Sequence, residues 1–302
     1  MKKSNVIGID LTKNVFQVCK IDQQGELLTN KAISPSKLKE LLAKTGPSIV
    51  AMEGCGACHY WARLAQKHGH DVRVISPKKV KAFLQGHKTY ANDAIAIAIA
   101  SIQFGMKLSQ INMEEQQSLQ TLETSRKFLD KELVALNNHI RAYLYEYGIT
   151  LRRGRKSLRE AMAIVLDDLD TRLPTCLKNT LDLLWARYQL TVEQLNEAEK
   201  YKAHLVNQLE PCQRLMDLEG IGKVCASMLY ANIGDGREFN NGRQASVYIG
   251  LTPKQQSPGG KTYLKGIDKQ GGNKELRAAL YQGALSVIYK LPANHERSKR
   301  PG

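Results

Sequence analysis

Three acidic residues stand where the catalytic groups of α/β proteins gather. Asp10 ends a short apolar run that starts at Val6, and Glu53 ends a second run that starts at Ser48. Asp93 lies near the start of a later helical segment. Ligand sites in α/β sheets lie at strand ends, and carboxylate oxygens suit Mg²⁺. The three acids therefore predict a Mg²⁺ site, although each acid alone is also typical of a cap or a solvated side chain.

Such a site has a defined chemistry. Two metal ions about 4 Å apart can clamp the attacking and leaving oxygens of an in-line phosphoryl transfer. A second candidate group is Ser257, in the glycine-containing segment from Pro253 to Lys261. A serine hydroxyl is a poor nucleophile until a base or a metal ion activates it. From the residues alone this segment is more typical of an exposed turn, and the nucleophile stays a hypothesis.

Two further segments could contact phosphates. Gly220 and Gly222, followed by Lys223 and an apolar helix, are similar to the hairpin of a helix-hairpin-helix, in which glycines let the backbone approach a phosphate. An ordinary turn between two helices is the alternative. The other segment is a basic loop between the two long helices expected below, and a solvated turn explains it equally well. Its candidate phosphate contacts are Arg152, Arg153 and Arg155.

The acids must be positioned by an α/β layer. Ser34 and Pro35 are typical of an N-cap and the first position of a helix. Strands are expected over residues 6–10, 15–19, 27–30, 48–53 and 72–75, with helices over 57–68 and 91–106. Three strands followed by βαβ alternation predict a mixed sheet. An Asp on strand 1 of a three-strand meander, with a Glu on strand 4, indicates a ribonuclease H-like fold.

The rest of the chain is predicted to be mainly helical. Leucines at spacings of three and four predict long antiparallel helices over 113–147 and 177–209, typical of a coiled-coil arm. A last helix is expected over 274–289. The fold class is thus α/β plus α, with an α/β domain over 1–106, a helical connector over 107–212 and a small, mainly helical domain over 213–302.

The charge of the chain indicates the class of partner. There are 44 Lys and Arg against 29 Asp and Glu, for a net charge of +15. The excess lies in 1–106 and 213–302, because residues 107–212 carry equal numbers of each sign. A basic surface favours nucleic acid, and a surface that only improves solubility is the alternative.

Composition also excludes some classes of protein. No apolar stretch is long enough for a membrane span, and the N-terminus lacks the features of a signal peptide. Six irregularly spaced cysteines are typical of reduced thiols. We therefore expect a cytoplasmic protein, associated with the bacterial nucleoid.

Several short motifs, taken in order, carry a family resemblance. They are Gly8-Ile9-Asp10, Met52-Glu53-Gly54-Cys55-Gly56, His59-Tyr60-Trp61-Ala62-Arg63, Val74-Ile75-Ser76-Pro77-Lys78, Lys88-Thr89-Tyr90-Ala91-Asn92-Asp93-Ala94, Gly220-Ile221-Gly222, Ile233-Gly234-Asp235, Gly250-Leu251-Thr252-Pro253, Ser257-Pro258-Gly259-Gly260-Lys261 and Gly266-Ile267-Asp268-Lys269-Gln270-Gly271. With them the chain resembles the insertion-sequence DEDD transposases (the insertion-sequence 110/1111 family). These enzymes are related to the Piv and MooV invertases and include the bridge-RNA-guided recombinases.

The resemblance implies a mechanism and a set of partners. It implies a RuvC-like N-terminal domain with Mg²⁺ at Asp10, Glu53 and Asp93, and a C-terminal transposase domain in which Ser257 attacks a DNA phosphate. Lys261, by its charge and spacing, could steady that phosphate. It further implies a structured guide RNA that pairs with DNA, and a homo-oligomer, dimer or tetramer, built through the helical connector.

Two departures from the family pattern leave alternatives open. Tyr90 stands where the family has a second acid, one helical turn before Asp93, and a neutral phenol does not replace a carboxylate ligand. Pro258 stands where relatives usually have a second hydroxyl residue. The chain also stops soon after Arg300, where many relatives continue. The alternatives are a RuvC-like metal-dependent nuclease without serine chemistry, and a decayed copy that binds nucleic acid but no longer cuts it.

Overall fold

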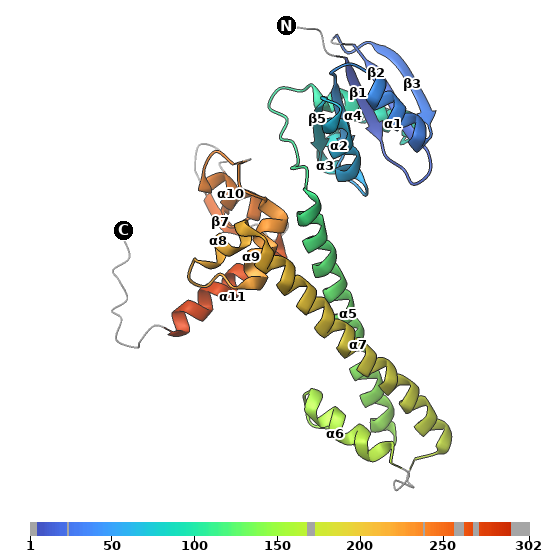
Figure 1. The fold of residues 1–302 in the computed structure, drawn as a ribbon, viewed down its shortest axis with the longest axis vertical. Helices are drawn as coiled ribbons and strands as arrows, with labels where there is room; N and C mark the ends of the chain where they lie inside the picture. The colour runs from blue at the N-terminus through green and yellow to red at the C-terminus, as the bar shows by residue number, and fades with distance from the viewer. Residues whose placement is uncertain are drawn as a thin grey trace. The chain divides into compact units, whose positions relative to one another are not determined.

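The computed structural model describes residues 5–22, 24–167, 173–237, 239–256, 263–267 and 272–290 (Figure 1). The chain divides into two compact units, residues 1–113 and 114–302. The finer division into domains ending at Met106 and Cys212 stays a prediction. In the described residues, no helix combines the length and the apolar character needed to cross a membrane.

The first unit is built on a five-stranded mixed sheet. Its strands are β1 (Val6–Asp10), β2 (Phe16–Ile21), β3 (Leu27–Ile33), β4 (Ile49–Glu53) and β5 (Asp71–Ile75). They lie in the order β3-β2-β1-β4-β5. The first three form an antiparallel meander, whereas β1, β4 and β5 are parallel to one another. The predicted α/β layer with a mixed sheet is therefore confirmed.

Helices cover both faces of this sheet (Figure 1). They are α1 (Pro35–Lys44), α2 (Cys58–Lys67), α3 (Pro77–Val80), the short 3₁₀ turn η1 (Lys81–Phe83) and α4 (Tyr90–Ser101). Ser34 caps α1 as predicted, since its side chain accepts from the Lys37 amide. The predicted end of α4 at Met106 was wrong. The helix ends at Ser101, and the chain turns through Gly105, whose φ of 72° is left-handed.

The core explains which face each helix covers. The odd residues Ile7 and Ile9 of β1 pack with Leu38 of α1 and Trp61 of α2. The even residue Val6 packs instead with Ala94 and Ala98 of α4. This division follows from the two-residue period of a strand. It places α1 and α2 on one face of the sheet and α4 on the other.

The second unit contains a two-helix arm, drawn in green and yellow in Figure 1. Its helices are α5 (Glu114–Glu146), α6 (Arg155–Val165) and α7 (Thr175–Gln208). Glu132 pairs with Arg187, and the earlier residue Glu123 of α5 pairs with the later residue Lys202 of α7. The two helices are therefore antiparallel. Both long helices match their predicted extents within two residues. The sequence pattern did not indicate α6, and Arg155 lies in its first turn rather than in the basic loop.

The C-terminal part of this unit combines short helices with one β-hairpin. Its elements are α8 (Glu210–Met216), α9 (Lys223–Ile233), α10 (Gly242–Ile249), β6 (Pro253–Gln256), β7 (Tyr263–Ile267) and α11 (Lys274–Lys290). The strands β6 and β7 pair antiparallel, where the sequence had indicated only a loop. All five residues of β7 are exposed, so no alternation of apolar and polar residues marks this strand.

Candidate active site

Asp10 and Glu53 are brought together by the pairing of two parallel strands. The last paired residues of β1 and β4 are Ile9 and Met52, and each acid is the next residue along its strand. Asp10 has the same parity as Val6, and Glu53 the same parity as Ile49, which packs in the same cluster beside α4. Both carboxylates therefore lie at the carboxyl edge of the sheet, on the face that α4 covers.

Asp93 joins them because α4 lies directly on β1. Gly8 makes this approach possible, since a Cβ atom there would lie 2.5 Å from the Ala94 carbonyl oxygen and 2.8 Å from the Ala98 Cβ. Thr89 caps the helix by accepting from the Asn92 amide. Asp93 thus sits in the first turn of a helix whose start is fixed over the strand ends.

The three carboxylates line one pocket of ≈ 900 Å³. The other charged residues of this pocket are Lys13, Lys81 and Lys88, which no sequence pattern had indicated. Tyr90 lines it too. Lysines are too frequent in this chain for their positions to have been informative before the fold was known. The pocket therefore presents carboxylates for a cation and ammonium groups for an anion side by side.

The electrostatics of the pocket follow from this crowding. Burial, and then the charges of Asp93 and Glu53, raise the pKa of Asp10 to about 6, while the Lys88 ammonium acts in the opposite direction. Burial and Asp93 also raise the pKa of Glu53, again against Lys88. Like charges held close together disfavour the ionised forms. A bound cation would relieve this repulsion.

The donor set fits a divalent metal ion in its chemistry. All three side chains offer oxygen, the ligand type of Mg²⁺ and Mn²⁺. Within the described part of the chain, however, no group of three or more His, Cys, Asp or Glu side chains is already placed to hold a metal.

The glycine turn between α8 and α9 has a structural role of its own. Gly220 has a φ of 81°, and a Cβ atom there would lie 2.8 Å from the carbonyl oxygen of Gly283 in α11. Gly222 is the N-cap of α9, has no such neighbour, and precedes Lys223. The close approach of α11 explains the glycine at 220, and the phosphate contacts expected at this turn stay predictions.

The basic segment before α6 is held by Arg141, a half-buried arginine of α5. Arg141 donates to the carbonyl oxygens of Arg152 at 2.9 Å and Gly154 at 2.6 Å. The side chains of Arg152 and Arg153 are exposed, whereas Arg155 lies 3.4 Å from Asp130. Backbone carbonyls thus face Arg141, which leaves the first two arginines of the segment directed to solvent.

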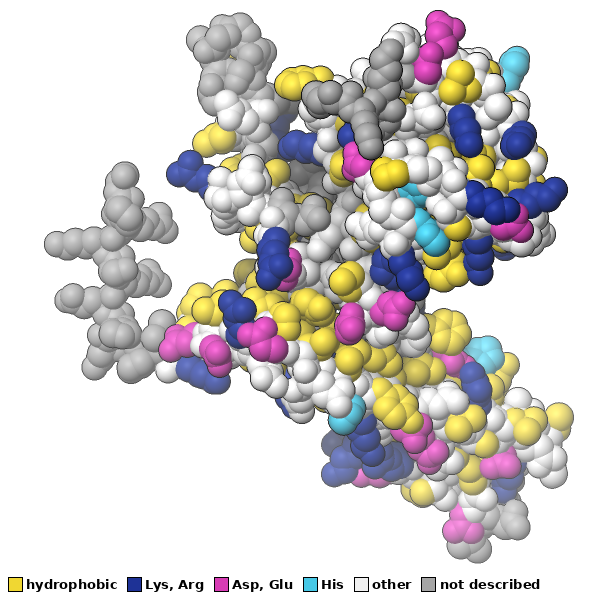
Figure 2. Space-filling view, turned by 45° about the horizontal axis from the view of Figure 1, so that its top comes forward, with side chains coloured by type: hydrophobic (Ala, Val, Ile, Leu, Met, Phe, Trp, Pro, Cys, Tyr) yellow, Lys and Arg dark blue, Asp and Glu magenta, His cyan; other side chains and the backbone are white. Residues whose placement is uncertain are grey.

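The remaining predicted site residues, Ser257 and Lys261, lie outside the described residues. The wider surface shows where charge gathers. Figure 2 shows basic side chains over the N-terminal unit, and basic and acidic side chains intermixed along the helical arm. This distribution agrees with the excess of basic residues in the first part of the sequence and the balance in the middle.

Comparison with known proteins supplies the family. Residues 212–299 match the family model described as "Transposase IS116/IS110/IS902 family", and residues 7–149 match a second transposase model, that of the DEDD domain of the same family. The latter match contains Asp10, Glu53 and Asp93.

Individual relatives cover almost the whole chain. The transposase for insertion sequence element IS1111A of Coxiella burnetii is 34% identical, over 95% of this chain and 79% of the relative. That for IS1328 of Yersinia enterocolitica is 36% identical, over 96% and 86%. The pilin gene-inverting protein of Moraxella lacunata is 26% identical, over 97% and 86%.

These matches give the acidic pocket its context. The DEDD transposase family implies dependence on a divalent metal ion and binding of DNA, and the matched residues 7–149 include the pocket that combines three carboxylates with lysines. Two family models, and relatives that match 95% or more of this chain, agree on one class of DNA transposase and recombinase. The chain belongs to the IS116/IS110/IS902 family of insertion-sequence transposases.

Proposed function

We propose that the protein cleaves and rejoins DNA strands to move an insertion sequence, using a Mg²⁺ site at Asp10, Glu53 and Asp93 and a nucleophilic serine at Ser257. The observation that carries the proposal is the convergence of the three carboxylates on one lysine-lined pocket. The strand order β3-β2-β1-β4-β5 with an antiparallel meander supports a RuvC-like, ribonuclease H-like fold. The turn between α8 and α9 supports a motif similar to a helix-hairpin-helix.

The roles of the residues follow from their chemistry. Mg²⁺ held by the three carboxylates would supply positive charge at the phosphoryl oxygens. As the bond between Ser257 Oγ and phosphorus forms, the bond from phosphorus to one sugar oxygen breaks. The serine proton passes to a base, and the departing oxygen takes up a proton. Lys261 and Lys88 carry positive charge that steadies the phosphate.

The proposed partners rest on charge and on exposed apolar surface. A net charge of +15 favours DNA together with a structured guide RNA. The arm exposes large apolar side chains, among them Phe128 and Leu183. A second copy of the chain would cover such side chains, and on this basis we propose a homo-oligomer formed through the arm.

The serine is tested by Ser257→Ala and the acidic pocket by Asp10→Asn, with labelled DNA that carries the ends of the element. The unmodified protein forms a covalent protein–DNA adduct that survives denaturation, and each variant loses it. Ser118→Ala is the matched control, because it removes an exposed hydroxyl from α5 and keeps the adduct. Cleavage that persists in Ser257→Ala would assign the protein to the metal-dependent nucleases without serine chemistry.

One observation favours a second candidate function, a nucleic-acid-binding protein without strand cleavage. Tyr90 lines the acidic pocket, where a phenol contributes no carboxylate. In that case the unmodified protein binds DNA without cutting it, and Tyr90→Asp restores cleavage. Cleavage by the unmodified protein in the presence of Mg²⁺ would exclude this candidate.

A further inference from the structure

The two chain segments that flank the β6–β7 hairpin meet at its base. We call this place the hairpin neck, formed by Ile249 and Gly250 on one side and Gly272 and Asn273 on the other. The Asn273 amide donates to the Ile249 carbonyl at 3.1 Å, and the Arg277 guanidinium donates to the same oxygen at 3.0 Å. A Cβ atom on Gly272 would lie 2.2 Å from this oxygen. The neck therefore closes tightly, and only glycine fits at 272.

The neck is anchored to α9 through a second set of contacts. The Asn273 side chain donates to Asn232 Oδ1 at 2.8 Å and accepts from the backbone amides of Glu275 and Leu276 at 3.0 Å each. It thereby caps α11. Leu276 is fully buried against Met228 and Ile249. The first turn of α11 is thus tied to both the neck and α9.

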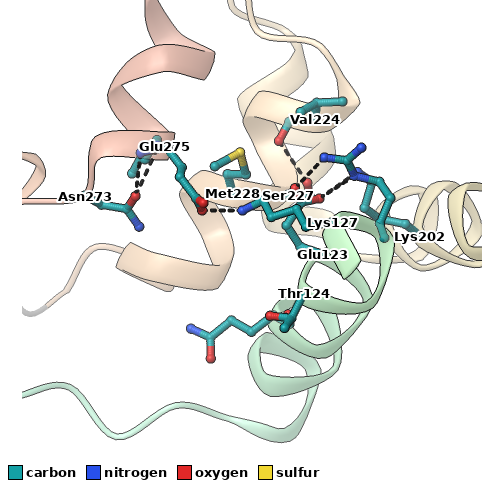
Figure 3. Close-up of polar contacts among 12 residues, drawn as sticks. Glu123, Thr124, Lys127, Lys202, Val224, Ser227, Met228, Asn273 and Glu275 are labelled. Carbon is teal, nitrogen blue, oxygen red and sulfur yellow. Dashed lines mark hydrogen bonds and ion pairs between the residues drawn. The ribbon is translucent and has the colours of Figure 1, made fainter. Parts of the chain in front are cut away.

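A third contact ties the same turn to α5. Glu275 forms an ion pair with Lys127, whose Nζ also lies 3.5 Å from Glu123 (Figure 3). Glu123 is itself held by Lys202 of α7 at 3.0 Å and by Arg126 at 3.0 Å. Figure 3 shows Lys127 directed from α5 toward Glu275 at the start of α11. A row of ion pairs therefore runs from α7 through α5 to the base of the hairpin.

The Lys127–Glu275 pair joins two segments that lie next to candidate site residues in the sequence. The helix starts at Glu114, directly after the unit that carries Asp10, Glu53 and Asp93, and is continuous for 33 residues. The hairpin strands end at Gln256 and resume at Tyr263, and they flank the segment that contains Ser257. Glu275–Lys127 thus links α5 to the base of the hairpin whose two strands flank residue 257 in the sequence.

We propose that the Lys127–Glu275 pair orients the hairpin neck on α5, which makes both side chains positioning residues for DNA strand cleavage. The inference rests on the proposed role of Ser257. A nucleophile displaced by about 1 Å can lose about 100-fold in rate. Glu275 is 60% exposed, and an exposed ion pair adds little to global stability. Removing the pair should therefore change the direction of the neck while the protein stays folded.

The test combines local structure with kinetics. In Lys127→Met and Glu275→Gln, amide hydrogen exchange rises in peptides that cover the neck and β7, while the melting temperature stays unchanged. At saturating DNA the single-turnover rate of covalent adduct formation falls about two- to fivefold, as the loss of an exposed ion pair allows, and DNA affinity does not change. Lys127→Arg and Glu275→Asp keep the charges and recover most of the rate.

A double variant isolates the pair. In the Lys127→Met background, Glu275→Gln should add no further loss, because the contact is already absent. Glu210→Gln removes an exposed carboxylate paired with Arg214 on α8 and serves as the matched control, with no change expected. The proposal is overturned if the losses in the rate of adduct formation add in the double variant, or if amide hydrogen exchange at the neck is unchanged. If the unmodified protein forms no serine adduct, the proposed function fails, and the exchange measurement still decides whether the pair orients the neck.

Discussion

At the scale of single residues, the acidic pocket depends on side chains that share a small volume. Burial, and then the charges of Asp93 and Glu53, raise the pKa of Asp10 to about 6, against the opposing effect of Lys88. Tyr90 lines the same pocket and contributes a phenol in place of a carboxylate. We therefore expect the number of carboxylates in the pocket, rather than the total charge of the protein, to set the affinity of the proposed cation site.

Tyr90→Asp should tighten divalent cation binding. An added carboxylate beside a divalent ion contributes about 1 to 2 kcal/mol at a high effective dielectric, which corresponds to roughly tenfold in affinity. Titration calorimetry with Mn²⁺ measures the change. Tyr145→Asp adds the same charge to an exposed site on α5 and should leave the affinity unchanged. An equal gain in both variants would show that the pocket is not the cation site.

Gly8→Ala should destabilise the first unit and weaken cation binding. The new Cβ would meet the Ala94 carbonyl at 2.5 Å and push α4 away from β1, and overpacking of this kind costs about 1 to 3 kcal/mol. Urea unfolding followed by Trp61 fluorescence in a Trp185→Phe background measures the loss. Gly46→Ala, where a Cβ meets no atom within 4 Å, is the control. Equal stability of the two variants would contradict the tight contact of α4 with β1.

At the scale of elements, the α5–α7 pair combines an apolar seam with one buried ion pair. Buried residues of α7 recur at spacings of three and four, and Lys202 occupies one of these positions. Its side chain is 8% exposed and pairs with Glu123, which is 14% exposed. A charged residue in such a seam specifies the register of the two helices. The apolar side chains hold the arm together, and we expect the ion pair to favour one alignment of the two helices.

Glu123→Gln should destabilise the arm in a manner that depends on pH. Burial tends to raise the pKa of Glu123, but hydrogen bonds from Arg126 and Lys202 and their charges lower it to about 2, against an ordinary 4.5. Folding therefore favours the ionised carboxylate, by at most about 3 kcal/mol. This contribution is complete above pH 4.5 and is lost as the pH falls toward 2.

Urea unfolding monitored by Trp185 in a Trp61→Phe background measures this effect. The variant should be less stable than the parent by about 2 to 3 kcal/mol at pH 7, and the difference should shrink at pH 3. Glu160→Gln on α6, which removes one partner of the exposed pair with Lys156, should change stability by less than about 0.5 kcal/mol. A difference that is the same at both pH values would contradict the assigned pKa.

At the scale of the whole molecule, the basic residues are unevenly distributed along the chain. The excess of basic residues lies in 1–106 and 213–302, and the helical middle is balanced. Within that balanced middle, Arg141 binds the backbone carbonyls of the basic segment before α6. The side chains of Arg152 and Arg153 in this segment are exposed to solvent. Local geometry can thus create a candidate phosphate contact in a neutral part of the chain.

The double variant Arg152→Ser with Arg153→Ser should weaken DNA binding in a salt-dependent manner. Each phosphate contact contributes about 0.9 to the slope of log affinity against log salt on duplex DNA, so the slope should fall by about 2. Fluorescence anisotropy at several salt concentrations measures it. Arg214→Ser, which removes an arginine paired with Glu210, is the control. An unchanged slope would leave the segment as a solvated turn.

Several features could be predicted from the sequence because their signals are local. Each of these signals lies within a short stretch of sequence: the strand ends at Asp10 and Glu53, the cap at Ser34 and the leucine spacing of the arm. The structure confirms these elements. The family followed from the order of short motifs. Signals of this kind can be recognised without knowing which distant segments of the chain are in contact.

Other features were decided only by the tertiary structure. The exposed strand β7 had no apolar alternation to mark it, and α6 was not expected. The lysines of the acidic pocket became informative only when η1 and the start of α4 were placed beside β1. Lys127 and Glu275 are separated by 148 residues, so no local pattern could pair them. The sequence determined the acids, the long helices and the family, whereas the packing of distant segments determined which charges meet, because such contacts depend on distances in space and not along the chain.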